Sequence, residues 1–335
     1  MDWLGVSIRK LYGRRLMMRG VFFLLFALVF AMAACGQPPA PATPDVVDRS
    51  DALPTDIVKG TPENDLFPPV ASAEWSQPVP LEEPVNTIGA EDSPFIPADG
   101  QSLYFFFTPD VRIPPGQQAS DGLTGIWRSA WTGSGWGEPV RVRLEEEGEA
   151  SLDGCEFALG DVLWFCSVRA GNINEIDWYI AHRVNGEWTD WQNAGKPING
   201  EYQVGEMHIT ADGQELYFAS QRPGGYGGYD LWVSQKAGEG WAEPVNLGEA
   251  VNTAENENRP YVSVDGQELW FDSRYSISRC LRGTDGAWGN CEVIISSLAG
   301  EPSLSPDGKT LYFVHHYLSA EQEIIEADIY VSWRQ

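Results

Sequence analysis

The chain has 335 residues, with 48 Asp and Glu against 22 Lys and Arg, and its formal net charge at pH 7 is −26. A surface this acidic repels nucleic acid and anionic lipid headgroups, so no nucleic-acid partner is expected. The four histidines form no ligand-rich motif, and the sequence predicts neither a metal nor a cofactor.

A secretory signal is predicted over residues 1–34. Basic residues come first, an apolar run from Val21 to Phe30 follows, and small residues lead to Cys35. This ending resembles a lipoprotein processing site, which implies that Cys35 carries lipid and holds the protein on the cell membrane or outer membrane. The protein would then face the periplasm or the exterior. Ordinary signal cleavage and an uncleaved anchor are the alternatives.

Residues 35–72 are predicted to be a disordered tether. The stretch 36–70 holds eight prolines and no sustained apolar period, a composition typical of semi-extended linkers. Residues 73–335 are then enough for one folded domain.

An internal repeat covers residues 73–335. Each copy opens on a tryptophan, and neighbouring copies are about 50 residues apart, a period typical of propeller blades. The tryptophans are Trp75, Trp136, Trp188, Trp241 and Trp288. The sequence therefore predicts an all-β fold, a five-bladed β-propeller of four-stranded antiparallel blades.

The copies share one order of strands. The run after the tryptophan, as in 136–140, contains proline in three copies and is predicted to be the outermost strand. An Asp-Gly hairpin turn such as Asp212-Gly213 precedes a continuous apolar strand such as Leu216-Tyr217-Phe218, which suits burial between blades. The last copy stops after its third strand, whereas the first begins with a fourth. We therefore expect the N-terminal strand to complete the last blade.

Recurring polar residues mark turns and crossings. Val85-Asn86-Thr87 and Val251-Asn252-Thr253 are predicted to cross from one blade to the next. Asp177, Asp230 and Asp328 recur where third strands begin, which indicates turn residues that accept hydrogen bonds from backbone amides.

The four cysteines after the signal form two pairs of equal separation. Cys280 and Cys291 are symmetric about Asp285-Gly286, a two-residue hairpin turn, so a disulfide between adjacent strands is predicted. Cys155 and Cys166 are predicted to form a second, more diagonal disulfide. Zinc is the competing interpretation, but neither pair has Cys-x-x-Cys spacing or a neighbouring histidine.

Two stretches resemble the WD-like β-propeller repeats of the TolB type, which are common in bacterial envelope proteins. They are Ser305-Pro-Asp-Gly-Lys-Thr-Leu-Tyr-Phe313 and Arg222-Pro-Gly-Gly-Tyr-Gly-Gly-Tyr-Asp-Leu-Trp232. The resemblance covers residues 74–335 and implies the fold and an envelope location, but no function. The six blades and extra N-terminal domain of TolB itself are not evident here.

Acidic residues lie just before or within the innermost strand of every copy, near the mouth of a propeller's central channel. Together with one arginine they form the predicted ligand-binding funnel: Asp92, Asp153, Glu156, Glu206, Glu257, Arg259 and Glu301. Several glycoside hydrolase families with five-bladed folds place carboxylates at this mouth, so a catalytic set of Asp92, Glu156 and Glu206 is an open alternative. Against catalysis, an acid in every copy is what duplication of a structural position gives.

Two other groups of side chains are candidate sites. Tyr226 and Tyr229, in a glycine-rich loop, could stack on a sugar or peptide, with core packing as the alternative. His315-His316 could join Glu321 or Glu323 at a metal, although no further ligand has suitable spacing.

The sequence thus predicts a lipid-anchored envelope propeller that binds a protein or glycan partner, has no chemistry of its own and is a monomer. Regular repeats combined with an export signal motivate this prediction. An extracytoplasmic enzyme of the glycoside hydrolase type is the alternative. A module that assembles an envelope complex through its rim is a third possibility.

Overall fold

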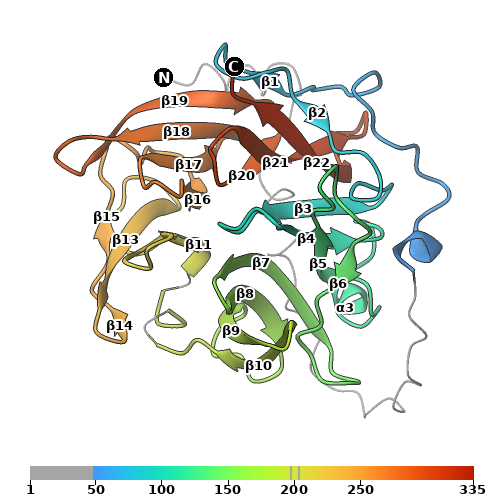
Figure 1. Ribbon diagram of the computed structural model, residues 1–335, viewed down its shortest axis with the longest axis horizontal. Coiled ribbons are helices and arrows are strands. Elements are labelled where there is room, and N and C mark those ends of the chain that lie inside the picture. The colour runs from blue at the N-terminus through green and yellow to red at the C-terminus, as the bar shows by residue number, and fades with distance from the viewer. Residues whose placement is uncertain (1–47, 197, 203) are drawn as a thin grey trace.

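The computed structural model describes residues 48–335 except 197 and 203, and its secondary structure is almost entirely β. Antiparallel sheets surround a common centre, which is the architecture of a β-propeller (Figure 1). The predicted signal peptide and Cys35 lie outside the described residues. No helix in the described part of the chain is long and apolar enough to cross a bilayer.

Three sheets are separate from one another. One contains β7 (Ser151–Leu159), β8 (Val162–Arg169), β9 (Asp177–Val184) and β10 (Glu187–Asn193). The next contains β11 (Val204–Ile209), β12 (Glu215–Ser220), β13 (Asp230–Ala237), β14 (Gly240–Trp241) and β15 (Val245–Asn246). The third contains β16 (Glu257–Val262), β17 (Glu268–Ser273), β18 (Ser276–Arg282), β19 (Trp288–Ser296) and the short β1 (Val70–Ala71).

The remaining strands form one eight-stranded sheet made of two antiparallel groups. The first group is β3 (Ala90–Phe95), β4 (Ser102–Thr108), β5 (Gly125–Ala130) and β6 (Val140–Arg141). The second is β20 (Ala299–Leu304), β21 (Thr310–Leu318), β22 (Ile324–Trp333) and β2 (Val79–Pro80). The groups are joined by a single parallel pairing, Ala327 with Ala90. Two short helices, η1 (Arg49–Ala52) and α3 (Pro115–Gln118), complete the described elements.

The strand positions follow the repeat. The predicted outermost strands β6, β10, β15 and β19 pair with the third strands β5, β9, β13 and β18. All seven residues of β4 are buried, because neighbouring sheets cover both of its faces. Leu163, Leu269 and Phe313 are likewise fully buried on the other second strands. Figure 1 shows β3, β7, β11, β16 and β20 nearest the centre.

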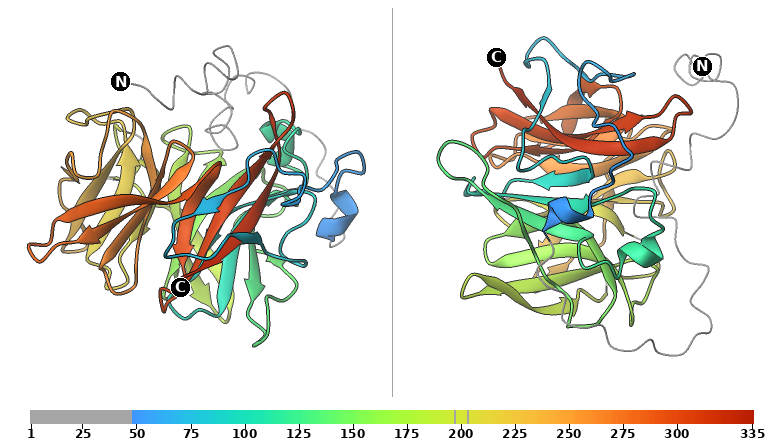
Figure 2. Two further views of the ribbon diagram at one scale, coloured as in Figure 1. Left: turned by 90° about the horizontal axis from the view of Figure 1, so that it is seen from above. Right: turned by 90° about the vertical axis from the view of Figure 1, so that its right-hand side faces the viewer.

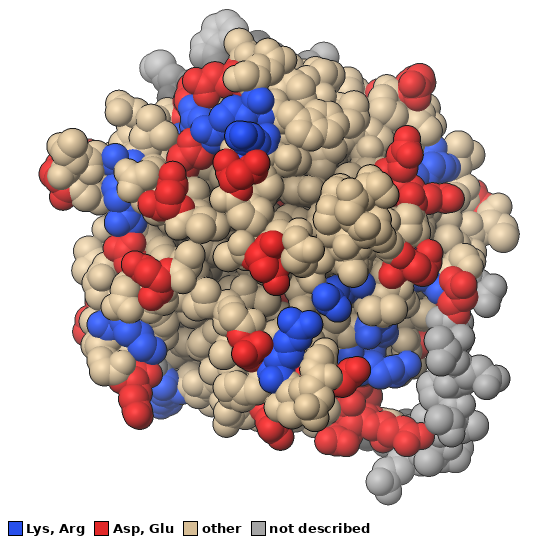
Figure 3. Space-filling view, viewed as in Figure 1, with Lys and Arg blue, Asp and Glu red and all other residues tan. Residues whose placement is uncertain are grey.

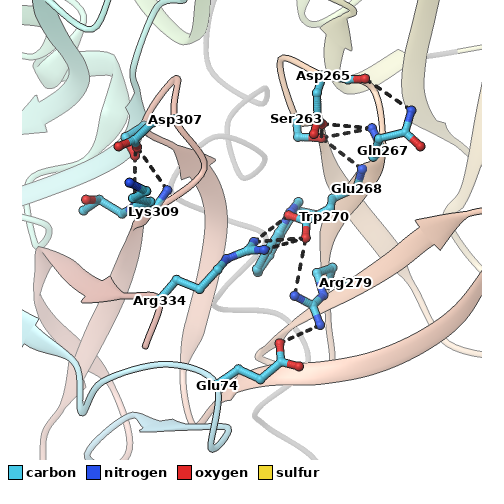
Figure 4. Close-up of polar contacts among 12 residues, drawn as sticks. Glu74, Ser263, Asp265, Gln267, Glu268, Trp270, Arg279, Asp307, Lys309 and Arg334 are labelled. Atoms are coloured by element: carbon cyan, nitrogen blue, oxygen red, sulfur yellow. Dashed lines mark hydrogen bonds and ion pairs between the residues drawn. The ribbon is translucent and has the colours of Figure 1, made fainter.

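The first repeat strand meets the C-terminal strand, as the strand order predicts. Strand β2 pairs with β22, and Trp75 bridges to Arg334. On the adjoining sheet, Glu268 accepts hydrogen bonds from Arg334 at 2.7 Å and from the Trp270 indole at 3.1 Å (Figure 4). Arg279 bridges Glu268 and the N-terminal Glu74 in the same view. Both segments are therefore fixed to each other and to β17.

Both predicted disulfides are present. Cys155 pairs with Cys166 and Cys280 with Cys291, with Cα atoms 5.5 and 4.0 Å apart. Each bond joins neighbouring strands of one sheet, β7 to β8 and β18 to β19. Two disulfides are typical of proteins that fold in an oxidising compartment outside the cytosol.

Asparagine side chains explain the repeated Asn turns. Asn252 accepts a hydrogen bond from the amide of Leu231 at 2.8 Å and donates one to its carbonyl at 2.9 Å. Asn86 makes the same pair of bonds with Ile329. The carboxamide thus substitutes for one residue of a pairing strand and holds the crossing segment against the third strand of its sheet.

Residues 48–67, expected to belong to the disordered tether, lie against the sheets (Figure 2). Arg49 is 4% exposed, pairs with the buried Glu91 at 3.2 Å and lies over the Phe107 ring at 4.9 Å. Lys59 contacts Glu326 and Asp328, two buried acids of β22. Composition indicated a linker, but these two basic side chains have buried carboxylate partners. Residues 48–67 therefore pack on the folded unit, ahead of the boundary expected at residue 73. We call residues 48–67 the N-terminal strap.

Candidate functional site

All five innermost strands carry a β-bulge at the same height. In each, two residues lie opposite one residue of the second strand: Ser93-Pro94, Cys155-Glu156, Gly205-Glu206, Arg259-Pro260 and Glu301-Pro302. The first residue has a positive φ of 52–57° in four of the five, a left-handed conformation that L-residues rarely adopt. Proline occupies the second position three times, where its missing N–H is not needed for the ladder.

The five bulges surround one central pocket. It encloses about 410 Å³, counting the part open to solvent, and every bulge contributes to its wall. Because a bulge turns its side chains away from the regular alternation, the pocket receives charged groups that an unbroken strand would direct elsewhere. Repeated backbone irregularities thus form a central pocket, and four residues of the predicted funnel line it: Glu156, Glu206, Arg259 and Glu301.

Arg259 connects the acidic side chains around the pocket. Its Nε lies 2.9 Å from Glu206 Oε1 and 2.5 Å from Glu301 Oε1, and its terminal nitrogen lies 3.3 Å from Asp272 Oδ2. Three carboxyl groups therefore share one guanidinium. Burial raises the pKa of Glu206 to about 7 despite the opposing charge of Arg259. Burial also raises the pKa values of Asp272 and Glu301, the latter well above its usual range.

Asp92 differs electrostatically from its neighbours. Burial acts to raise its pKa, but contacts with His316 and Glu301 outweigh burial and leave the pKa lowered. His316 Nε2 lies 3.9 Å from Asp92 Oδ2. Asp92 is thus an ionised acid beside Glu301, which retains its proton to higher pH.

Glu156 is the unusual member. Its residue is 4% exposed and lines the pocket, yet neither carboxyl oxygen has a hydrogen bond to another described residue. Burial raises its pKa well above the usual range, and the nearby charges of Glu206 and Asp92 act in the same direction. A buried carboxyl without a partner costs free energy, so the fold retains Glu156 at the expense of stability.

Aromatic rings form the next layer of the pocket wall. Phe95, Phe157, His208 and Tyr261 follow the bulges along their strands and line the pocket. His208 lies 4.7 Å from Tyr261 and 5.8 Å from Phe157, measured between ring centroids. Burial lowers the pKa of His208 to about 4, so its imidazole is neutral at neutral pH.

Three residues of the predicted funnel lie outside the pocket wall: Asp92, which lies behind it beside Glu301, and the two acids Asp153 and Glu257. Asp153 accepts hydrogen bonds from Arg169 at 2.6 Å and Ser151 at 2.9 Å. Glu257 accepts bonds from the amide and hydroxyl of Thr253 at 3.0 and 2.6 Å. Both acids hold loops in place, and the structural interpretation of a repeated acid applies to them.

The other predicted positions have structural surroundings. Tyr226 is 52% exposed in its loop, whereas Tyr229 packs against a core cluster, and neither lines the pocket. Asp177 and Asp230 accept hydrogen bonds from loop amides as expected. Asp328 differs, because it pairs with Lys59.

Asp272 is a site residue that the sequence did not indicate, and His316, which was considered only as a metal ligand, faces Asp92 instead. Both lie on second strands, β17 and β21, behind the bulges of the inner strands. The signal that could have found them is a polar residue within an otherwise apolar Leu-aromatic strand, as in Leu269-Trp-Phe-Asp272. His315, next to His316, is buried and bonded to Asp65 of the N-terminal strap at 2.8 Å.

The described residues contain no group of three or more His, Cys, Asp or Glu arranged to hold a metal ion. On the face seen in Figure 3, acidic side chains lie beside the lysines and arginines. Exposed ion pairs include Arg274 with Glu255 and Arg112 with Asp56. Such pairing leaves few basic groups to attract a polyanion.

Fold and site together define a β-propeller protein with an acid-lined central pocket. No family model matches the chain, and no curated protein is similar to it. Among solved structures it is similar to TolB from Acinetobacter baumannii, at 14% identity and a TM-score of 0.39, covering 74% of this chain and 55% of that one. It is also similar to an alpha-L-arabinofuranosidase from Lactobacillus brevis, at 13% identity and a TM-score of 0.43, covering 74% and 92%. This chain spans about half the length of the Acinetobacter protein. Similarities this low do not assign a function.

Proposed function

We propose that the protein is an exported, lipid-anchored propeller that binds a protein or glycan partner through its central pocket without chemical conversion. One observation carries this proposal. Glu156 is buried in the pocket wall with both carboxyl oxygens unpartnered, an arrangement that a ligand would complete. The left-handed residues around it add backbone strain, which proteins retain where binding or catalysis uses it.

We further propose that the ring has five blades. The two groups of the eight-stranded sheet meet at one pairing, Ala327 with Ala90, whereas each is fully paired within itself. Counting these groups separately gives five units, each with one bulged inner strand at the pocket. Because β2 closes the ring within one chain, we propose that the protein is a monomer.

The export part of the proposal rests on the N-terminal sequence and the two disulfides. Cells that express the full chain with labelled palmitate should incorporate label, and Cys35→Ser should abolish it. Equal labelling of wild type and Cys35→Ser would reject lipidation at this residue, although export could still be correct.

Binding is favoured over catalysis because most acids of the pocket already have partners. Glu206, Asp272 and Glu301 are held by Arg259, which limits their movement towards a substrate. Hydrolysis by two carboxyl groups needs both of them to approach the scissile bond. A network fixed around one guanidinium is better suited to recognition.

A glycosidase is the second candidate, and a specific observation favours it. The pKa values of Asp92 and Glu156 move in opposite directions, which is how paired acids in enzymes divide the roles of base and acid. In this alternative Glu156 donates a proton to the leaving oxygen, Asp92 activates water and Glu206 assists.

One experiment separates the two candidates. The purified full chain is incubated with envelope polysaccharides, glycans and aryl glycosides, and both binding and release of reducing ends are measured. Binding without turnover, weakened in Glu156→Gln, supports the proposal. Turnover that Glu206→Gln or Glu156→Gln abolishes would establish the enzyme instead. Binding to a protein partner is tested by co-purification from solubilised membranes with the same variants.

A further inference from the structure

We infer that the group recognised by the central pocket is an organic cation, an ammonium or guanidinium such as the end of a lysine or arginine side chain of a partner. This inference rests on the proposed function, because it takes the central pocket to be the binding site. It narrows the ligand from any protein or glycan to one bearing a positive charge.

The first argument is that the pocket has more carboxyl groups than basic side chains to pair with them. Five carboxyl groups approach the pocket from four sheets: Asp92, Glu156, Glu206, Asp272 and Glu301. Arg259 is shared among three of them, and His316 faces Asp92. Among the described residues, no positive group pairs with Glu156. Glu156 is therefore the carboxyl group of the five that has no cationic partner and with which an incoming cation could pair.

The second argument is the aromatic wall. Phe157 is adjacent to Glu156 in sequence, and with Phe95 and Tyr261 it lines the same pocket. A cation over an aromatic ring is attracted by the ring's negative face, and the attraction increases when water is excluded. His208 lies among these rings and is uncharged at neutral pH, so it does not repel a cation. Carboxyl groups and aromatic rings in one pocket wall are surroundings that favour an alkyl-ammonium group.

The third argument is chemical balance. Burial keeps a proton on Glu156 because ionising it without a counter-ion is unfavourable. A bound ammonium supplies the counter-ion, so Glu156 ionises, one proton leaves for solvent, and the new ion pair replaces the O–H bond. The net charge of the complex equals the summed charges of the free protein and the free ligand, less the one positive charge of the released proton. A neutral hydroxyl would satisfy one hydrogen bond but could not drive this exchange.

The alternatives match these observations less well. An anion would meet Asp92 and the other acids and be repelled. A metal ion needs three or more ligands in reach of one point, and the described residues present no such set. A ligand with a single extended cationic group requires only one carboxylate and an apolar wall.

The test uses the full chain in detergent and three probes of similar size. These are n-butylammonium, n-propylguanidinium and uncharged n-butanol, titrated by calorimetry at pH 7 in two buffers that differ in ionisation enthalpy. We expect one or both cations to bind at least tenfold more tightly than butanol, with close to one proton released per cation. Glu156→Gln should weaken cation binding at least tenfold, while Glu187→Gln, the same Glu-to-Gln change at an exposed position on β10, should not.

Several results would overturn the inference: equal binding of butanol and butylammonium, cation binding that Glu156→Gln leaves unchanged, or saturable binding of Ca²⁺ with none of the amine. Thermal unfolding of each variant verifies that it is folded. Failure here differs from failure of the proposed function. If a glycan or protein partner binds, is lost in Glu156→Gln and is not displaced by butylammonium, the pocket is the site but its ligand is not cationic. If no partner depends on Glu156, the proposed function fails, and the calorimetry still decides cation binding.

Discussion

Replacing Glu156 by methionine should make the protein more stable. The carboxyl is buried with no partner, and burying such a group costs about 1–3 kcal/mol. Methionine has a similar length, is apolar and adapts to irregular spaces. We therefore expect Glu156→Met to raise the free energy of unfolding by about 1–3 kcal/mol, or the Tm by roughly 2–5 °C in a domain of this size.

The gain in the free energy of unfolding should depend on pH. The variant Glu156→Gln isolates this pH-dependent contribution. Burial raises the folded-state pKa of Glu156 above the usual value of 4.5, with Asp92 and Glu206 acting in the same direction. The folded state therefore binds this proton more tightly than the unfolded state does. The resulting stability is complete below pH 4.5 and is lost as pH rises through the folded-state pKa. Both variants lack this loss, so their advantage over wild type should widen by up to about 1.4 kcal/mol per pH unit in that interval.

The assay is urea unfolding of wild type, Glu156→Met, Glu156→Gln and Glu187→Gln at pH 4, 6 and 8. Near pH 4 Glu156→Gln should match wild type, and at pH 8 it should exceed wild type, whereas Glu187→Gln should match it throughout. The charged groups nearest Glu156, namely Asp92, Glu206, Arg259 and Glu301, are the same in every protein compared, so the difference between variants reports on Glu156 alone. A loss of more than 1 kcal/mol in both Glu156 variants, or an advantage that is constant with pH, would refute the reasoning.

Three further changes test the closure and the turns. Glu268→Ala should lower the free energy of unfolding by about 2–3 kcal/mol in urea melts. The reason is that Arg279 loses Glu268 as a partner, although it keeps others such as Glu74. A change below about 0.5 kcal/mol would mean that the ion pairs around Glu268 do not stabilise the fold. Deleting residues 73–80 removes β2 and a buried tryptophan and should cost at least about 4 kcal/mol; an unchanged Tm would contradict ring closure. Asn252→Ala should cost about 1–3 kcal/mol in the same melts, since the Leu231 amide loses its partner while its carbonyl keeps the bond from the Leu247 amide, and Asn252→Asp should restore the bond from the Leu231 amide; a change below 0.5 kcal/mol in Asn252→Ala would contradict this role.

The sequence predicted the parts of the fold that repeat. Tryptophan spacing and Asp-Gly turns located the strands, because each blade must bury the same faces and reverse direction at the same points. The pair Cys280 and Cys291 could be predicted because a short hairpin fixes which residues face each other. The closure by β2 followed from counting strands at the two ends.

Other features were beyond a single sequence. Periodicity does not show that two residues will oppose one in every inner strand, so the exact direction of Glu156 or Arg259 was not predictable. The role of Asp272 depends on its contact with Arg259 of another strand, which no pattern along the chain reveals. The N-terminal strap has a linker composition, and its attachment depends on single ion pairs such as Lys59 with Asp328, which leave no pattern along the chain.

The attachment of the N-terminal strap has a mechanical consequence. If the protein is held to a membrane through its N-terminus, a pulling force reaches Arg49 before it reaches any sheet. The force would next have to separate Lys59 from its acids, and only afterwards peel β1 from β19 and β2 from β22. Because these ion pairs would separate before any strand does, a force applied at the N-terminus need not deform the pocket.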